Sequence, residues 1–414
     1  HKIGLWETPF FQDSMIIEAT RDISKVGFPI NIDRIMYLDG ECSISEKDFK
    51  KFHKYYVNSY KKEGIKPFNN LEDLIRHHRN IAIKSSFLMG RKKLGKRSLK
   101  ELIAKLKKFD EFVKPNISLA YAIQPLDTFF RDLLEKKLSN YFKRLGISEK
   151  NKIIAVLASP NRPVLMVKEQ LDILSIAKKI SKNKKIKNMF IKKPAEQIVN
   201  AIKRQDTELF NLIKKHVRAY SWMSNFNWGQ QQASIEDYIK RIKSLMVVDA
   251  ASEISRIKAE REIADKEFKR IVNNTLKFGI DIRKEVNSIK EFVVLKMENW
   301  EAVSISGNNC LPLFTEIGKR LNLNLEEFFL YSTDEIVALA DNKLLKQDLA
   351  ANKQKRGLLR IKNSIYHLKK EEILQIQNSM AKEYEAINLH GTIVYPGIIS
   401  GVASIVMTSK NLAK

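Results

Sequence analysis

The sequence predicts a mostly α-helical protein, a multi-helix scaffold with β structure confined to short pieces. Glycine and proline are scarce, at 15 and 10 of 414 residues, against typical usage of about 7% and 5%. Hydrophobic residues make up 44% and charged residues 29%, which is the balance of a globular chain. A single stretch, Gly391 to Met407, combines spaced glycines with β-branched residues. The length predicts about two to three domains with buried cores.

The net charge of +26 is the strongest signal in the composition. A dense positive charge binds phosphate backbones without regard to base sequence, which favours a nucleic-acid partner. The lysines are spread along the whole chain among many Ile and Asn residues, a mixture that an AT-rich genome produces in any protein. We therefore interpret the charge first as a background property, and keep nucleic-acid binding as the alternative function.

The expected compartment is the cytoplasm, with no membrane partner. No apolar run reaches the roughly 18 residues of a membrane span, and the N-terminus lacks a basic patch followed by an apolar core. Cys42 and Cys310 lie far apart and match no metal or redox spacing, as expected in a reducing compartment. Because the sequence starts at His1 and stops soon after the β segment begins, we expect a fragment of a longer polypeptide.

The first elements are a helix, a short strand and a second helix. Residues 5–23 predict a segment and a helix that dock on the main body. Residues 22–39 are interrupted by turn formers and include a strand-like piece, Arg34 to Leu38. Helix resumes at Ser45. The run from Ser98 to Glu101 is a capping box that opens an amphipathic helix.

The middle of the chain predicts shorter helices with antiparallel packing. The helix that begins after Ser98 is expected to end at Pro115, and another helix follows from Leu126. The apolar run Ile153–Leu157 fits a strand or the start of a helix equally well. Because proline is favoured in the first turn of a helix, helix starts are expected at Pro160, Pro163 and Pro194.

Two long helices are predicted in the second half. Apolar residues recur at helical spacing over 254–271 and again over 282–295, with Phe278 and Gly279 between the two runs. We expect these helices to form a long helical hairpin. Shorter helices are predicted at 311–321, at 325–330 and after the capping box at Ser332.

The motifs that resemble functional sites have structural explanations that we favour. The run Gly90 to Lys96 matches the first seven positions of a phosphate-binding P-loop, but Arg97 replaces the hydroxyl residue that would bind magnesium. The aromatic block of Tyr220, Trp222 and Trp228 could stack on nucleic-acid bases, yet aromatics at helical spacing are more often core. The seven histidines show no metal-binding or catalytic spacing.

The C-terminal segment resembles a known family. Gly391, Pro396-Gly397 and Gly401-Val402-Ala403, followed by a β-branched run, are similar to the entry of the swivelling phosphohistidine domain of the phosphoenolpyruvate-utilising enzymes, the group of phosphoenolpyruvate synthase and pyruvate phosphate dikinase. The blocks before it resemble the central helical region of synthase-like members. They are the Tyr220-Ser221-Trp222 block with the Ser234-capped helix, the Phe278 to Phe292 helix with Arg283, and the run from Leu321 to Leu339.

The resemblance covers roughly the C-terminal half and implies a transferase. In that family an ATP-grasp domain phosphorylates a histidine of the swivelling domain, which carries the phosphoryl group to a distant small-molecule acceptor. The implied partners are the ATP-grasp and phosphohistidine domains of the same parent chain, and ATP and Mg are implied for the parent enzyme. Whether ATP or phosphoenolpyruvate is the donor stays open. The helical region would act as scaffold and hinge support.

The resemblance divides the chain into three parts but transfers no active-site residue. The parts are an N-terminal helical region with minor strand pieces at 1–250, the hairpin and connecting helices at 251–388, and the truncated start of the swivelling domain at 389–414. The carrier histidine of the family lies in a Gly-Gly-x-x-Ser-His motif that this chain lacks, and His390 precedes the first strand. No catalytic, cofactor-binding or metal-binding residue is therefore assigned. Structural turn roles are assigned to Gly391, Gly397 and Gly401.

Overall fold

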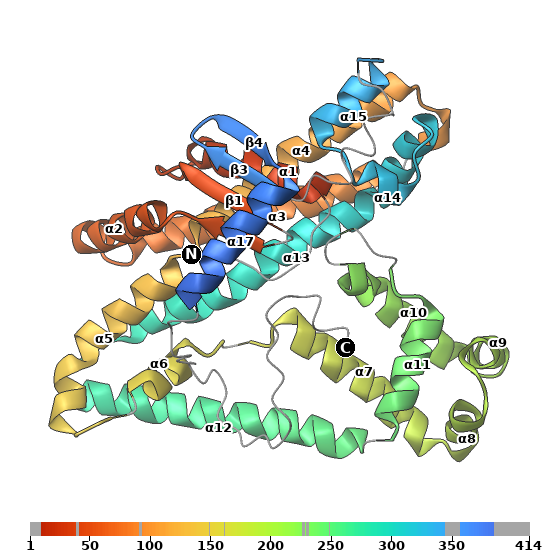
Figure 1. Cartoon of the computed structure of the whole chain (residues 1–414). Helices are drawn as coiled ribbons and strands as arrows, with labels where there is room; N and C mark the ends of the chain where they lie inside the picture. Colours follow the sequence, from red (N-terminus) through yellow and green to blue (C-terminus); the bar gives the residue numbers. More distant parts are fainter. Residues whose placement is uncertain are drawn as a thin grey trace.

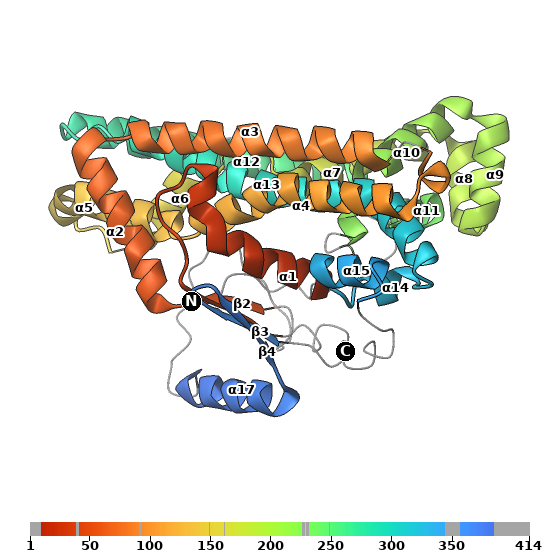
Figure 2. The ribbon, with the colours of Figure 1, turned by 90° about the horizontal axis from the view of Figure 1, so that it is seen from above.

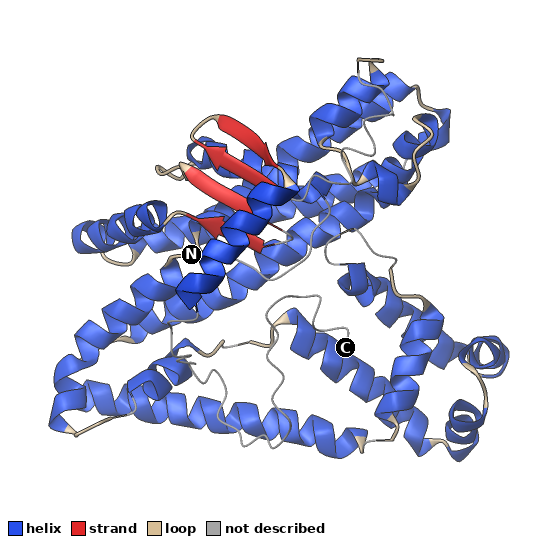
Figure 3. Ribbon diagram, in the orientation of Figure 1, coloured by secondary structure: helices blue, strands red, loops and turns tan. Residues whose placement is uncertain are grey.

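The mostly α-helical prediction is confirmed. The computed structural model describes residues 10–38, 41–90, 93–148, 150–160, 162–225, 228, 232–247, 249–343 and 357–384. Most of these residues are helical, and the strands among them form one small antiparallel sheet (Figure 3).

Three long helices form a central bundle. They are α3 (Lys66–Gly90), α4 (Leu99–Ala122) and α13 (Arg283–Arg320). They lie alongside one another (Figure 2), and each contributes fully buried apolar side chains, such as Ile75, Leu106 and Val303. The other elements of the main core pack around this bundle.

Shorter helices surround the bundle. Those nearest the N-terminus are α1 (Phe10–Ala19), the 3-10 helix η1 (Thr20–Val26), α2 (Glu46–Glu63), the 3-10 turn η2 (Leu94–Lys96), α5 (Leu126–Arg144) and α6 (Lys150–Ala158). The run Ile153–Leu157, which the sequence left undecided, is therefore helical. Near the opposite end, α14 (Leu325–Phe328) packs on α13, and α15 (Thr333–Ala340) packs on α4.

The helix starts predicted at serines are confirmed by their caps. At each serine the side-chain oxygen accepts a hydrogen bond from a backbone N–H of the first turn, which would otherwise lack a partner. The caps at Ser98, Ser234 and Ser332 are complete capping boxes, whereas the Ser45 oxygen accepts from the Asp48 N–H. Of the starts predicted at prolines, α9 begins directly after Pro194 and α7 begins two residues after Pro163, whereas Pro160 lies between α6 and α7 and starts no helix.

The sheet joins two segments that are distant in sequence. Its strands are β1 (Arg34–Leu38), β2 (Glu41–Ile44), β3 (Gly357–Ile361) and β4 (Ser364–Leu368), in the order β2-β1-β3-β4. The strand predicted at β1 is confirmed, and β1 pairs with β3 so that Tyr37 lies opposite Leu358. Helix α17 (Lys370–Tyr384) follows β4, and its Ile373 packs against Leu38 and Leu368. The pairing ties the end of the described chain to its beginning.

A second hydrophobic core defines a separate helical lobe. The lobe consists of α7 (Leu165–Lys182), α8 (Lys184–Lys192), α9 (Ala195–Gln205), α10 (Thr207–Tyr220), the 3-10 turn η3 (Ser221–Asn225) and α11 (Ile235–Leu245). Its core contains the fully buried Ile198 and Ile213 and does not merge with the main core. The main core draws residues from both sides of the boundary predicted at residue 250.

Helix α12 (Ala250–Lys277) connects the lobe to the central bundle. A short turn after Phe278 leads into α13, so the two predicted long helices do follow each other directly. Near the turn, the Lys290 amine lies 3.3 Å from the centroid of the Phe268 ring. Beyond it the helices diverge, and the bundle, α12 and the lobe form the sides of a triangular frame (Figure 1).

Two helices are longer than predicted, and each contains a proline. α4 continues through Pro115, where we expected it to end, and α13 continues through Pro312, so the separate helix predicted at 311–321 is part of α13. A proline inside a helix costs about 3 kcal/mol, because it removes a backbone hydrogen bond. The residues that follow Pro115 are fully buried, among them Ile117 and Leu119. The Asn116 amide also donates to two backbone carbonyls. Burial in the bundle therefore outweighs the local penalty.

Candidate functional site

The glycines that carry the family resemblance cannot be placed. Gly391, Gly397 and Gly401, together with the strands predicted at 389–414, lie outside the described residues. The last described element before them is α17.

The P-loop-like run serves helix packing. Gly90 is the last residue of α3, and a Cβ atom on it would lie 1.9 Å from the backbone oxygen of Asn309 on α13. Glycine is therefore required there for the close approach of two helices, which is a structural role. Lys96 ends a 3-10 turn, and the Gly95 carbonyl accepts a hydrogen bond from Arg320.

The aromatic block is core, as predicted. Trp228 is 0% exposed, and its indole packs against Phe11 and Phe109. Trp222 and Tyr220 are also buried. These rings present no face on which nucleic-acid bases could stack.

The histidines among the described residues are not gathered into a site. His77 and His78 are adjacent on α3 with ring centroids 5.3 Å apart, and burial followed by the charge of His77 lowers the pKa of His78. His216 is buried in the helical lobe. Among the described residues, no group of three or more His, Cys, Asp and Glu side chains could hold a metal ion.

Charged side chains concentrate where the α6–α7 linker meets the central bundle. We call this group the arginine–glutamate cluster. Its members are Arg76 and Arg79 on α3, Arg162 in the linker, and Glu291, Glu298 and Glu301 on α13. Sequence reasoning missed it, although the glutamates repeat at spacings of seven and three residues, which places them on one side of a helix.

Arg162 is the centre of the arginine–glutamate cluster. Its guanidinium donates to Glu291 at 3.1 Å and also to Glu298. Arg76 donates to Glu291, and Arg79 lies 3.5 Å from Glu298. Arg76 also donates to Glu72 on α3 at 3.0 Å. Since the three cations face four carboxyl groups, the cluster leaves no surplus positive charge for an anionic ligand. The charge-assisted hydrogen bonds of the cluster hold the linker against α13.

Glu301 is the unusual member of the cluster. Its side chain is buried, and burial together with the charge of Glu298 raises its pKa to about 7, against the opposing effect of Arg79 and Arg162. A carboxyl group with this pKa exchanges protons near neutral pH. The charge on Glu301 therefore changes near neutral pH.

A second buried carboxylate ties α2 and α5 to the start of α13. Glu285 accepts hydrogen bonds from Tyr60 of α2 and Lys137 of α5. Burial opposes ionisation of Glu285, but these two hydrogen bonds hold its pKa below the ordinary value. The triad is a static link between three helices.

The helical lobe has its own buried ion pair. Glu169 is 2% exposed and accepts two hydrogen bonds of 2.7 Å from Arg241. The His216 ring nitrogen lies 3.1 Å from the same carboxylate. Burial disfavours the charge on Glu169, yet hydrogen bonds from His216 and Arg241 keep its pKa lowered. A cavity of about 640 Å³ adjoins this pair and is walled largely by apolar side chains, including Met166 and Ile173.

The lobe also carries a lysine-rich face. Between positions 165 and 246 there are 17 basic and 7 acidic residues. Five lysines at the ends of α7 and α8 are exposed and have no carboxylate partner among the described residues. These residues, the lysine face, are Lys182, Lys184, Lys185, Lys192 and Lys193.

Comparison with known proteins identifies no relative: no family model matches the chain, and no curated protein matches it. Within the described ranges, no helix has the length and apolarity needed to cross a bilayer.

Proposed function

We propose that this chain is the scaffold and hinge support of a phosphoenolpyruvate-utilising phosphotransferase. In this proposal the parent enzyme moves a phosphoryl group from ATP or phosphoenolpyruvate to a small-molecule acceptor through a phosphohistidine. The ATP-grasp and phosphohistidine domains of the same chain supply the chemistry, with ATP and Mg as cofactors. The compartment is the cytoplasm.

One observation carries the proposal. The pattern Gly391, Pro396-Gly397 and Gly401-Val402-Ala403 follows directly on a long helical body whose last described helix is α17. A mobile carrier domain needs a fixed frame between its two sites, because phosphoryl transfer depends on positioning. A helical frame in which ion pairs such as Arg162–Glu298 join separate elements suits that role. In this proposal the catalytic groups lie in the other domains of the parent chain.

The first test is to sequence the reading frame on both sides of this segment. We expect a Gly-Gly-x-x-Ser-His motif within a few dozen codons after Lys414. The full-length protein should then take up radiolabel from ATP labelled at the transferred phosphate, or from labelled phosphoenolpyruvate, in an acid-labile form. Replacing the motif histidine by alanine should abolish labelling.

His390 provides the matched control, since it lies close to the motif in sequence but is not expected to carry phosphate. The His390→Ala variant should label like the unaltered protein. A stop codon directly after Lys414, or a full-length protein that takes up no label from either donor, would contradict the proposal.

A second candidate function is nucleic-acid binding by the helical lobe. The observation that favours it is the lysine face, which consists of five exposed lysines without a carboxylate partner in the described part of the chain, on a lobe that is strongly basic. Such a surface binds phosphate backbones by counterion release, so affinity should fall steeply with salt.

The test compares binding of duplex and single-stranded DNA at two salt concentrations. Replacing Lys184, Lys185 and Lys192 by glutamine should weaken binding and reduce the salt slope by about 2–3. A matched triple variant at exposed lysines of α2 (Lys50, Lys61 and Lys62) controls for total charge. If both variants weaken binding equally, the lysine face has no special role.

A further inference from the structure

One side chain of the helical lobe lies in the core of the central bundle. In sequence Trp228 falls between η3 and α11, and both of these elements belong to the lobe. Its indole ring is nevertheless buried in the main core, against Phe11 and Phe109. Among the described residues between positions 165 and 245, Trp228 is the only one that the main core contains. Trp228 therefore anchors the lobe in the bundle.

The indole ring of Trp228 occupies a notch on α13. The notch is open because Gly307 has no side chain that would fill it. The indole N–H donates to the Ser304 carbonyl at 3.3 Å, and beside it the Gln232 amide donates to the Asn308 side-chain oxygen at 2.9 Å. Both acceptors lie within one turn of Gly307. A few side-chain contacts on one stretch of α13 therefore hold this end of the lobe.

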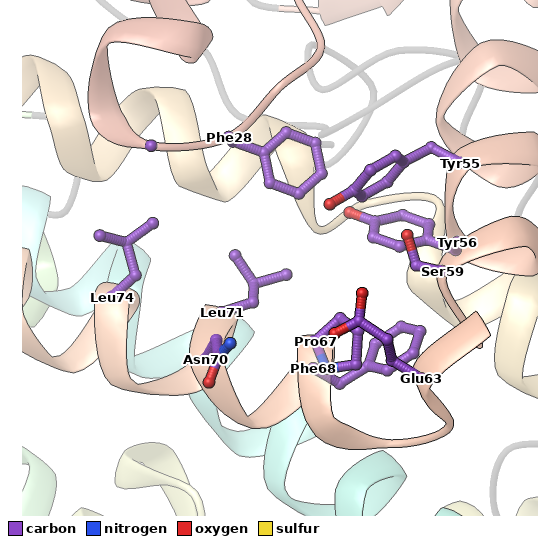
Figure 4. Close-up of a pocket in the computed structure, with 11 residues that line it drawn as sticks. Phe28, Tyr55, Tyr56, Ser59, Glu63, Pro67, Phe68, Asn70, Leu71 and Leu74 are labelled. Atoms are coloured by element: carbon purple, nitrogen blue, oxygen red, sulfur yellow. The ribbon is translucent and has the colours of Figure 1, made fainter.

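The backbone of Trp228 is strained. Its φ is 64°, in the left-handed region that bulky side chains rarely adopt. The turn after η1 brings a ring into the core without this strain, because Gly27 takes the left-handed φ of 88° and the next residue, Phe28, turns its ring toward Tyr55 (Figure 4). Strain of the kind seen at Trp228 persists only where the surroundings hold it, and it recurs in switch regions. Docking of the indole therefore works against a local penalty.

Helix α12 connects the two units without merging their cores. Near its start Ile254 and Ile257 pack on the lobe core, and near its end Phe268 and Ile271 pack on the main core. Between these two parts Ile263 is 65% exposed, and α12 spans the distance from the lobe to the bundle (Figure 1). Withdrawal of the indole from its notch therefore leaves the lobe core and both ends of α12 packed as they are.

We propose that the helical lobe alternates between a docked position, with Trp228 in the notch on α13, and an undocked position, in which the indole has left the notch. Burial of the indole favours the docked position, whereas the backbone strain at Trp228 favours release. The lobe turns about α12 and the α6–α7 linker, which Arg162 holds to Glu298. This exchange is independent of the phosphotransferase proposal, since it rests only on contacts between the lobe and the bundle.

The test is fluorine NMR of the protein labelled with fluorotryptophan. The sequence contains four tryptophans, and the resonance that disappears in the Trp228→Phe variant belongs to Trp228. This resonance should show a second population, or exchange on the microsecond-to-millisecond timescale of domain motions. Trp300, which packs on Tyr121 within the bundle, is the internal control and should show one state. A single Trp228 resonance without exchange would overturn the proposal.

Two variants should shift the exchange toward the undocked position. Gly307→Ala places a methyl group against the Trp228 ring and should raise the undocked population at least about tenfold. Gln232→Ala is a milder change that removes one hydrogen bond, and it should raise this population about two- to tenfold. Gly95→Ala, where a methyl group meets no described atom within 4 Å, and the exposed Gln197→Ala are the matched controls and should leave the population unchanged.

Small-angle X-ray scattering shows whether the lobe moves together with the indole. The radius of gyration of Gly307→Ala should exceed that of Gly95→Ala, and circular dichroism should show equal helix content in both, which separates undocking from unfolding. If the Trp228 resonance shifts while the radius of gyration stays the same, the ring moves alone and the proposal is wrong. It is also wrong if Gln232→Ala and Gln197→Ala give the same population.

Discussion

Single residues fix the closest approaches in this protein. Trp228 sits against α13 because Gly307 has no side chain. A Cβ atom on Gly307 would lie 1.9 Å from the Trp228 ring. The indole N–H donates to the Ser304 carbonyl one turn earlier, at 3.3 Å. One glycine thus makes room for the largest fully buried side chain of the main core.

Gly307→Ala should lower the free energy of unfolding by about 3 kcal/mol, because a rigid indole ring cannot yield to the added methyl group. Denaturant unfolding measures this change. Gly95→Ala is the control, since a methyl group added there would meet no atom of the described residues within 4 Å. It should change stability by less than about 1 kcal/mol. If the two substitutions changed stability equally, contact with Trp228 would not be the reason that position 307 requires glycine.

Glu301 makes stability depend on pH. Its pKa is raised from 4.5 to about 7 in the folded protein. Between these values the folded state keeps a proton that the unfolded state releases, so the free energy of unfolding falls as pH rises. The Glu301→Gln variant carries a neutral side chain at every pH. Between pH 5 and pH 8 its free energy of unfolding should therefore fall by about 2 kcal/mol less than that of the unaltered protein.

Unfolding curves at the two pH values measure the Glu301 contribution as a difference. Burial also raises the pKa of Asp110, to about 6, but this group titrates in both proteins and cancels. The exposed Glu326→Gln serves as the control and should follow the unaltered protein. If the free energy of unfolding depended on pH in the same way in the Glu301 variant and in the unaltered protein, Glu301 would be excluded as the source of this pH dependence.

At the scale of elements, buried carboxylates hold helices together. Glu285 joins three helices, and Glu169 joins α7, α10 and α11 through His216 and Arg241. Removing one partner of a buried ion pair is costly, because it leaves the other charge without compensation. The guanidinium of Arg241 is partly exposed, which moderates the effect.

Arg241→Gln should therefore destabilise the helical lobe by about 2 kcal/mol. Hydrogen exchange followed by mass spectrometry should show faster exchange in α7, α10 and α11, and little change in α3 and α13. Lys240→Gln is the neighbouring control, because Lys240 pairs with Asp237 on the exposed surface and should have little effect. Equal exchange in both variants would contradict a structural role for the Glu169 pair.

At the scale of the whole molecule, two cores predict two cooperative units. The main core includes Leu313, and the lobe core includes Ile213, and both side chains are 0% exposed. Since the cores do not merge, the lobe can unfold while the central bundle stays folded.

Ile213→Ala should lower the stability of the lobe alone, and Leu313→Ala that of the bundle, each by about 2–5 kcal/mol. Calorimetry combined with hydrogen exchange can separate the two transitions. Each substitution is the control for the other, because the two residues lie in different cores. A single transition that both variants shift equally would show that the frame unfolds as one unit.

The sequence by itself determined the helical class, most helix starts and the buried state of Trp228. These features depend on local periodicity and on caps, where Ser98 or Ser234 meets the first turn of its own helix. It also determined the strand at Arg34–Leu38, because β-branched and aromatic residues bounded by turn formers are a local signal.

Only the tertiary structure decided the rest. Pro115 and Pro312 stay inside helices because burial in the bundle outweighs a lost hydrogen bond. β3 was missed because its partner β1 lies more than 300 residues earlier. The arginine–glutamate cluster is assembled from α3, the α6–α7 linker and α13, so the spacing of the glutamates along α13 does not show which cations they meet. Side chains that act together across elements can be recognised only once packing has brought them within contact distance.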